Sequence, residues 1–197
     1  EQIQQFSVTW RMQRAGIGYI GIDRFAESTA VEMAAAVHAL EQAQARALVL
    51  DLRGNAGGVV DSALAVADRF LQPTDVVVYR RSRTGERTFQ AQGADNKISL
   101  PLVVLVDGET ASAAEIVAGA LQHHDRALLI GEATSGKGSV QEVFDLGDGS
   151  SVHVTTAIWL TPDRRQIDNR GLMPDIAIRS SDAPGDEQLN RAVACLE

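Results

Sequence analysis

Ser112 and Lys137 are the two side chains of this sequence best suited to act together in a reaction. Ser112 follows an apolar run, residues 102–106, and begins an alanine-rich helical pattern, whereas Lys137 stands between two glycines on a later loop. A serine hydroxyl is a weak nucleophile until a neighbouring base accepts its proton. A serine at a helix start and a lysine on a glycine-rich loop therefore predict a nucleophile and its general base, which is the chemistry of a hydrolase.

Histidine is the usual proton acceptor for serine, but the histidines of this sequence suit the role poorly. Helical rise places His123 and His124 about 16–18 Å from Ser112 along the same helix, beyond reach. His38 falls in a helical segment and His153 in the middle of a strand. A Ser-His-Asp arrangement through His153 is left open as a less favoured alternative.

Lys137 can act as the base only if its amine is uncharged. A free lysine has a pKa near 10.4, so the pKa must fall by about 2–3 units, and burial in an apolar site has that effect. Gln141 offers an amide oxygen that could orient the neutral amine. In a straight strand the two side chains would stand about 13 Å apart, so the pairing requires a bend, which Gly138 permits.

Two glycines before a predicted helix offer backbone N–H groups to a ligand. Gly57 and Gly58 follow the apolar run 47–52 and precede the clearest apolar stripe of the sequence. Either amide could stabilise the oxyanion of an attacked carbonyl, an effect worth about 3–4 kcal/mol per donor. The structural alternative is a tight turn that needs a positive φ, and Ser112-x-x-Glu115 likewise matches an ordinary capping box.

The segment from Gly131 to Gly138 also resembles a phosphate-binding loop. It lacks the serine or threonine expected directly after the lysine. A phosphate site further needs a helix to begin there, whereas residues 139–149 alternate like a strand entering a hairpin. Nucleotide hydrolysis is therefore the less favoured interpretation.

The order of the predicted elements indicates an α/β fold with a mostly parallel central sheet, crossover helices and β-hairpins. Strands are expected at residues 16–24, 47–52, 76–81, 87–92, 102–106, 127–130, 140–146, 151–160 and 174–178. Helices are expected at 29–44, where Thr29 and Glu32 would form a capping box, from residue 60 to 71, from Ser112 onwards and at 186–196. Ligands of such sheets bind at the carboxyl ends of the strands. Loops 53–58, 107–112 and 131–139 should converge there.

Composition fits one globular domain. The chain has 197 residues, of which 45% are hydrophobic, and a formal charge of −8, which argues against a nucleic-acid partner. Arg80, Arg81 and Arg83 form the only basic cluster, interpreted as a solvated strand end. Cys195 is the single cysteine, so no internal disulfide or cysteine metal site is expected, and no apolar run approaches the about 20 residues of a membrane span. Because the sequence begins with Glu1, we expect a mature or trimmed fragment.

Several motifs together resemble one peptidase family. They are residues 16–22 (GIGYIGI), 50–58 (LDLRGNAGG), 111–116 (ASAAEI), 127–132 (ALLIGE), 136–141 (GKGSVQ) and 171–175 (GLMPD). In this order they are similar to the catalytic domain of the carboxyl-terminal processing peptidases, or tail-specific proteases, and the resemblance covers residues 17–178. It implies a ClpP/crotonase-like α/β core.

The resemblance implies a role for each matching residue. Ser112 would be the nucleophile, Lys137 the general base and Gln141 the group that orients it, with the amides of Ala113 and of Gly57 or Gly58 as the oxyanion hole. An acyl-enzyme would form, with no metal or organic cofactor. Protein or peptide substrates with exposed or unfolded C-terminal regions are implied, as is a place outside the cytoplasm, in the bacterial periplasm or cell envelope.

The same resemblance sets the expected organisation. Residues 1–197 would be a single catalytic domain with a lead-in segment, 1–16, and a C-terminal helical tail, 179–197. The PDZ domain of the family is expected to be absent from this chain, and Ala114 stands where relatives often carry a small hydroxyl residue. A homo-oligomer or a regulatory partner stays open. The alternatives are a non-catalytic peptide- or lipophile-binding module and a thioester enzyme of the crotonase type on the same fold.

Overall fold

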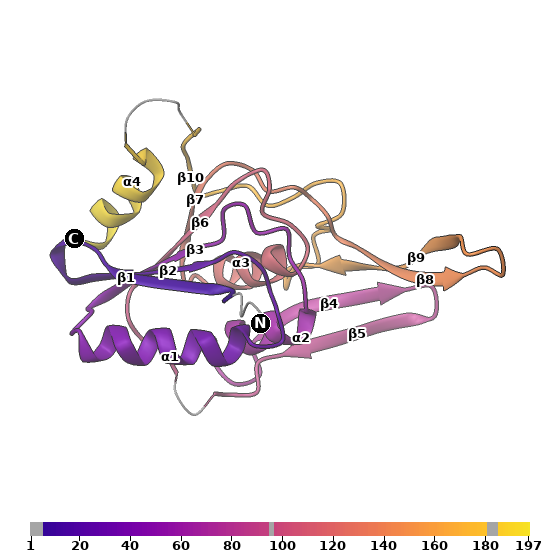
Figure 1. Ribbon diagram of the computed structural model, residues 1–197, viewed down its shortest axis with the longest axis horizontal. Helices are drawn as coiled ribbons and strands as arrows, with labels where there is room; N and C mark the ends of the chain where they lie inside the picture. Colours follow the sequence, from indigo (N-terminus) through magenta and orange to yellow (C-terminus); the bar gives the residue numbers. More distant parts are fainter. Residues whose placement is uncertain (1–5, 95–96, 181–184) are drawn as a thin grey trace.

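The computed structural model describes residues 6–94, 97–180 and 185–197, which form two β-sheets, with the helices packed around the first of them (Figure 1). The central sheet has the order β1 (Val8–Met12), β2 (Ile17–Ile22), β3 (Ala47–Asp51), β6 (Leu102–Val106), β7 (Leu128–Gly131) and β10 (Ile176–Ala177). Only β1 runs antiparallel to its neighbour, and a short 3-10 turn, Arg14–Gly16, links it to β2. The predicted α/β fold with a mostly parallel central sheet is confirmed.

Helices cover both faces of this sheet, which explains why every residue of its inner strands β3 and β6 is buried and all of them except Asp51 are apolar. Helices α1 (Thr29–Gln42), α2 (Val60–Asp68) and α3 (Ala113–His123) pack with Leu48 and Leu50 of β3 on one face. Helix α4 (Glu187–Leu196) packs against Val49 of the same strand on the other. A strand buried on both faces has no need to alternate apolar and polar residues.

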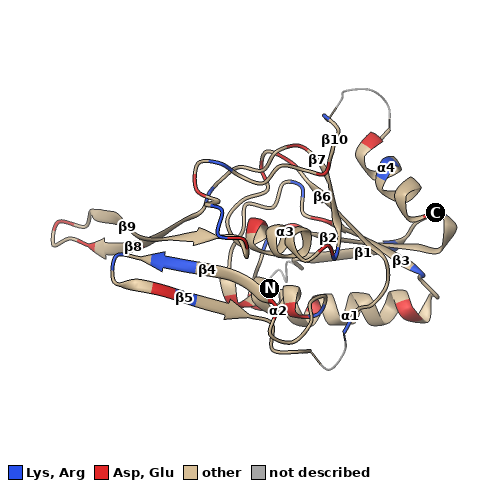
Figure 2. Cartoon of the chain, turned by 180° about the vertical axis from the view of Figure 1, so that it is seen from behind, with Lys and Arg blue, Asp and Glu red and all other residues tan. Residues whose placement is uncertain are grey.

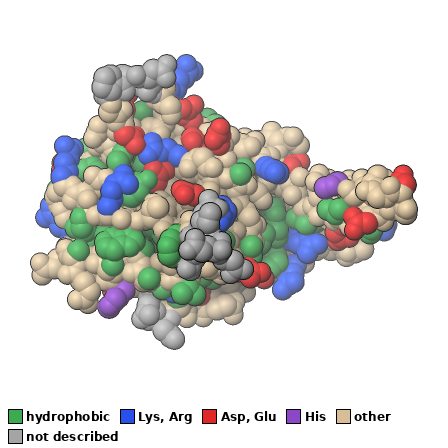
Figure 3. All heavy atoms as spheres, viewed as in Figure 1, with side chains coloured by type: hydrophobic (Ala, Val, Ile, Leu, Met, Phe, Trp, Pro, Cys, Tyr) green, Lys and Arg blue, Asp and Glu red, His purple; other side chains and the backbone are tan. Residues whose placement is uncertain are grey.

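A second sheet of four antiparallel strands stands beside the first. Its order is β5 (Gly85–Gln90), β4 (Val76–Ser82), β9 (Ser151–Leu160) and β8 (Ser139–Asp145). The β8–β9 hairpin projects well beyond the rest of the molecule (Figure 1, Figure 3). Residue 138 joins this sheet to the loop that carries Lys137, so the second sheet starts beside the predicted site.

Most elements lie within a few residues of their predicted bounds, but the start of the first helix differs. Ser28, not Thr29, is the N-cap of α1. The Glu32 carboxylate accepts hydrogen bonds from the Ser7 and Val8 amides, at 2.7 and 3.0 Å, instead of closing a capping box with Thr29. Glu32 thereby ties α1 to strand β1, which was not predicted. None of the helices in the described ranges has the length and apolar character to cross a membrane.

Candidate active site

Ser112 lies at a sharp corner between β6 and α3. Its backbone has φ 55° and ψ −117°, a conformation that L-residues rarely adopt and that costs about 1–3 kcal/mol. Backbone strain of this kind clusters at functional sites. Gly57 packs directly against the corner, because a Cβ at Gly57 would lie only 2.8 Å from the Ser112 Cβ. The loop of residues 53–58 and the corner therefore meet, as predicted.

The structure distinguishes between the two glycine amides. The Gly57 N–H donates to Asn55 Oδ1 at 2.8 Å, so it is already engaged. Within the described residues, the N–H groups of Gly58 and Ala113 donate to no acceptor. These two amides are the donors available to a developing oxyanion beside Ser112.

Asn55 fixes the shape of the glycine loop. Its side chain is fully buried, and Nδ2 donates to the Ile22 carbonyl at 2.7 Å. The Ala111 amide donates to the Asn55 carbonyl at 2.9 Å, which links the loop to the segment before Ser112. The Gly54 amide donates to both oxygens of Asp107 at 3.0 Å. The loop is thus held from both sides, so that the Gly58 amide has a defined position.

Glu115 joins the Lys137 loop to the Ser112 corner. Its side chain is fully buried, and Oε2 accepts hydrogen bonds from the amides of Ser112 and Lys137, each at 2.9 Å. The two amide nitrogens consequently lie no further apart than twice that distance. The other oxygen, Oε1, accepts from the Gly136 amide at 2.8 Å and from the Thr134 hydroxyl. The sequence identified Glu115 only as a capping residue, and its contact with the later loop was not predicted.

The Lys137 loop is held closely against residues 167–172. A Cβ at Gly136 would lie 2.8 Å from the Gly171 nitrogen, and one at Gly138 would lie 2.3 Å from the Asp168 nitrogen. Both flanking positions therefore require glycine. The loops expected to converge at the carboxyl ends of the strands do converge.

The side chains of Lys137 and Gln141 are both exposed. Within the described part of the chain, the Lys137 amine forms no hydrogen bond or ion pair, either with Ser112 or with Gln141. Lys137 precedes strand β8, and a bulge between Val140 and Gln141 bends its start. The backbone of the loop is in place beside Ser112, but the burial expected of the amine is not provided by the described residues. His153 lies on the exposed outer part of the β8–β9 hairpin.

A partly buried ion-pair network, which the sequence analysis did not predict, lies at the end of β3. The Arg53 guanidinium donates to both oxygens of Asp51 and to both oxygens of Asp186, the N-cap of α4. Burial works against the charged forms, but the mutual hydrogen bonds prevail, so the pKa of Arg53 is raised and that of Asp186 is lowered. Asp51 also accepts from the Tyr19 hydroxyl at 2.9 Å. The network fixes the start of the glycine loop to helix α4.

No group of three or more potential metal-ligating side chains occurs within the described ranges. The groups that meet at the corner are a hydroxyl, backbone amides and a lysine-bearing loop held by a buried carboxylate. This set is suited to acyl transfer, in which a nucleophile attacks a carbonyl and amides stabilise the oxyanion.

Known proteins are similar to this chain in both sequence and fold. A carboxyl-terminal-processing protease of Synechocystis sp. is 40% identical over 188 residues, covering 91% of this chain and 44% of that protein. The carboxy-terminal processing protease CtpA of Bacillus subtilis is 39% identical over 165 residues, covering 84% of this chain and 35% of that protein. The solved structure of a photosystem II D1 C-terminal processing protease superposes with a TM-score of 0.79 at 33% identity, covering 97% of this chain and 53% of that one.

The chain spans less than half the length of these two curated relatives. The sequence pattern described as peptidase family S41 matches residues 16–178, which include the second sheet, every strand of the central sheet except β1, the Ser112 corner and the Lys137 loop. By this match and by these relatives, the chain belongs to peptidase family S41.

Proposed function

We propose that this chain is a serine endopeptidase that uses Ser112 as nucleophile and Lys137 as general base. The observation that carries the proposal is the buried Glu115, which binds the amides of both residues and so holds a strained serine corner against the lysine loop. A carboxylate bound by both loops would hold them in a fixed relative position, as a nucleophile and its base require. Family membership supports the same reaction class.

The proposed reaction proceeds by acyl transfer. The Ser112 Oγ attacks the peptide carbonyl carbon as the Lys137 amine accepts the hydroxyl proton. The amides of Ala113 and Gly58 stabilise the oxyanion. When the C–N bond breaks, the lysine gives its proton to the leaving amine, and water then attacks the acyl-enzyme with the lysine again as base.

Lys137 must be desolvated before it can act. Its side chain is exposed in this chain. We propose that bound substrate covers the amine, since an apolar surface over it would favour the neutral form. Gln141, on the bent start of β8, would then accept a hydrogen bond from the amine and orient it.

The substrates that we propose are proteins with accessible C-terminal regions. Relatives of this chain carry the name carboxyl-terminal-processing protease, and an extended chain end is the kind of peptide that an open site can bind without unfolding a domain. We further propose a location outside the cytoplasm; the matched relatives include bacterial and chloroplastic proteins.

Labelling with a serine-directed acylating probe tests the assignment. We expect Ser112→Ala to abolish both labelling and cleavage of an unstructured protein, and Lys137→Ala to abolish cleavage, with circular dichroism unchanged in each variant. Gln141→Ala should reduce kcat by a smaller factor. Cleavage that persists in both alanine variants would exclude the Ser-Lys pair, and peptide binding without any cleavage would favour a binding module instead.

The pH dependence gives an independent readout. If a neutral lysine is the base, kcat/KM should rise with pH through an ionisation between pH 6 and 10. A flat profile over this range would contradict the role of the amine.

A further inference from the structure

Within the described residues, one edge of strand β5 has no neighbouring strand. β5 is the outermost strand of the second sheet, and helix α2 lies beside its carboxyl end (Figure 1, Figure 2). A cavity of about 430 Å³ lies between the two elements, and we call it the β5–α2 groove. It is lined by Asp61, Leu64, Ala65, Asp68, Arg87, Thr88, Phe89, Gln90 and Gln92. Because this lining includes no residue of the Ser112 corner or the Lys137 loop, the groove is separate from the proposed active site.

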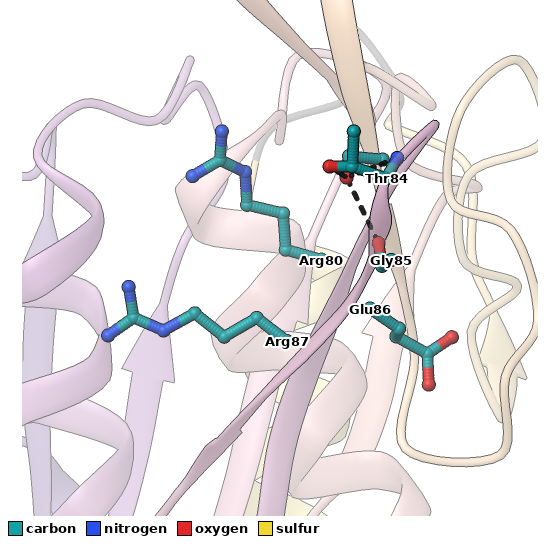
Figure 4. Close-up of a pocket in the computed structure, with 6 residues that line it drawn as sticks. Arg80, Thr84, Gly85, Glu86 and Arg87 are labelled. Carbon is teal, nitrogen blue, oxygen red and sulfur yellow. Dashed lines mark hydrogen bonds between the residues drawn. The ribbon is translucent and has the colours of Figure 1, made fainter.

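The groove runs along the edge of β5 and not over one of its faces. Neighbouring side chains of a strand point to opposite faces of the sheet, as those of Glu86 and Arg87 do in Figure 4. Four consecutive residues of β5, 87–90, nevertheless line the groove. A space that touches residues of both faces lies beside the backbone. The N–H and C=O groups at the outer edge of β5 therefore face the groove.

Thr88 directs its backbone groups into the groove. In an antiparallel pair, residues bonded to the partner strand alternate with residues whose N–H and C=O groups point away from it. The two-residue turn of the hairpin makes Ser82 and Gly85 a bonded pair, so Thr88, three positions further on, points away from β4. Outside the β4–β5 ladder, no hydrogen bond between described residues engages its amide or carbonyl. Gln90 follows the same alternation, because its carbonyl accepts a hydrogen bond from Gln92 Nε2 at 2.9 Å.

Helix α2 forms the opposite wall of the groove. Asp68 Oδ1 accepts hydrogen bonds from the Gln92 and Gly93 amides, at 2.7 and 2.8 Å, which fixes the end of the helix to the segment that follows β5. Asp61 lies two helical turns earlier, about 10 Å along the axis, and so faces the middle of the strand. The Asp61 side chain is exposed, and its carboxylate forms no hydrogen bond or ion pair with a described residue.

The side chains of the groove indicate the chemistry of its ligand. Leu64, Ala65 and Phe89 give it an apolar floor. The Arg87 guanidinium lies over the Phe89 ring, 4.6 Å from the ring centre, so this cation already has a partner. The carboxylate of Asp61 is the charged group that remains available. A lysine or arginine next to an apolar residue complements this lining.

We propose that the β5–α2 groove binds an extended, basic segment of a partner protein by strand addition. The segment would pair with the backbone of Thr88, place an apolar side chain against Leu64 and direct a lysine or arginine to Asp61. Strand addition takes its affinity from main-chain hydrogen bonds and its specificity from alternate side chains. The net charge of −8 favours the approach of a basic partner. This binding is separate from the proposed peptidase reaction and does not depend on it.

A labelled peptide tests the preference for a basic ligand. The probe is a decapeptide of alternating serine and valine with one central lysine, fluorescein at its amino end and an amide at its carboxyl end. Fluorescence anisotropy follows its binding to the full 197-residue chain with Ser112→Ala. We expect the lysine peptide to bind at least about threefold more tightly than the same peptide with a central glutamate, and this advantage to shrink in strong salt. Equal binding of the two peptides, or no binding of the lysine peptide, would overturn the proposal.

N-methylation of the probe tests strand pairing from the side of the ligand. In an added strand, one alternate set of amides faces β5 and the other faces solvent. Methyl groups on the first set remove main-chain donors, so we expect them to weaken binding about tenfold or more. Methyl groups on the second set should leave the affinity unchanged. The same effect from both sets would mean that the peptide does not pair as a strand, which would overturn the proposal.

A backbone variant locates the pairing on β5. Thr88→Pro removes the outward N–H but no bond of the β4–β5 ladder, and proline is tolerated at such edge positions. We expect this variant, with an unchanged circular dichroism spectrum, to bind the lysine peptide about tenfold more weakly. Thr88→Val, the matched control that keeps the N–H, should bind it normally.

A charge variant locates the basic side chain. Asp61→Asn should reduce the preference for the lysine peptide over the glutamate peptide. Glu41→Gln on α1, which changes the net charge equally, should keep it. Binding that is unaffected by both Thr88→Pro and Asp61→Asn would place the peptide elsewhere and overturn the proposal. None of these measurements needs turnover, so the groove would stand if the peptidase proposal failed, and the peptidase proposal would stand if the groove failed.

Discussion

Substitution of Glu115 by glutamine tests whether one buried carboxylate aligns the two proposed catalytic loops. Glu115 accepts four hydrogen bonds, from the amides of Ser112, Gly136 and Lys137 and from the Thr134 hydroxyl. A glutamine can keep two of them through its oxygen, and its NH2 group can donate to the threonine. The third amide, most simply that of Gly136, then faces a donor and loses its acceptor.

The expected cost follows from these bonds. A lost hydrogen bond to a charged group costs about 1.5–3 kcal/mol. The remaining hydrogen bonds also weaken because glutamine is uncharged, but the neutral side chain avoids the cost of burying a charge, which offsets part of that weakening. We expect a net loss of about 2–3 kcal/mol, seen as a fall in Tm of about 4–12 °C for a chain of this size. Calorimetry of Glu115→Gln beside Glu41→Gln, an exposed control on α1, measures it.

Activity should respond more strongly than stability. A misplacement of the lysine loop by about 1 Å can reduce the rate by about 100-fold, so kcat should fall at temperatures where Glu115→Gln is fully folded, with KM little changed. A variant that keeps both its Tm and its kcat would refute the idea that Glu115 aligns Ser112 and Lys137. A lower Tm with an unchanged kcat would mean that Glu115 stabilises the fold but does not align the two loops for catalysis.

Three further changes probe the neighbourhood. Gly58→Ala should reduce kcat at least about tenfold, because the new Cβ would lie 2.1 Å from a backbone carbonyl oxygen and must displace the amide that we propose as an oxyanion donor. Gly147→Ala, whose new Cβ would meet no atom within 4 Å, should have no effect. Asp186→Asn should weaken the hold of α4 on Arg53 and lower the urea midpoint by an amount that shrinks in strong salt. Burial, assisted by the nearby Asp51 carboxylate, raises the pKa of Tyr19 to about 12, so on a rise in pH the unfolded chain loses the phenol proton before the folded chain does. The free energy of unfolding should therefore fall as the pH rises from about 10 to about 12. Urea titrations should show a smaller fall in Tyr19→Phe, which has no phenol proton to lose.

The sequence predicted the central strands well because burial on two faces leaves a plain signal. The run 102–106 became β6 with the same bounds, and the strand 47–52 differs from β3 by one residue. Strand β1 was missed, since four of its five residues are exposed or polar and its position depends on Glu32, a contact distant in sequence. The convergence of the loops followed from the general rule that ligands bind at the carboxyl ends of parallel strands.

Details of the site depended on contacts that have no periodic signal. Which of the Gly57 and Gly58 amides remains free depends on the side chain of Asn55, which accepts a hydrogen bond from the Gly57 N–H. The role of Glu115 depends on how the loop of Gly136 folds more than twenty residues later. Arg53 and Asp186 are 133 residues apart in the sequence, so no local pattern could have revealed the pair.

The corner residue has a consequence for selection experiments. Ser112 occupies a region of φ and ψ that glycine enters freely, and relief of about 1–3 kcal/mol of strain should offset the backbone entropy that glycine loses on folding. A library sorted only for heat resistance should therefore tolerate or even enrich glycine at this position, whereas one sorted for turnover should retain the hydroxyl. Selection for thermal stability and selection for catalytic activity would then favour different residues at position 112.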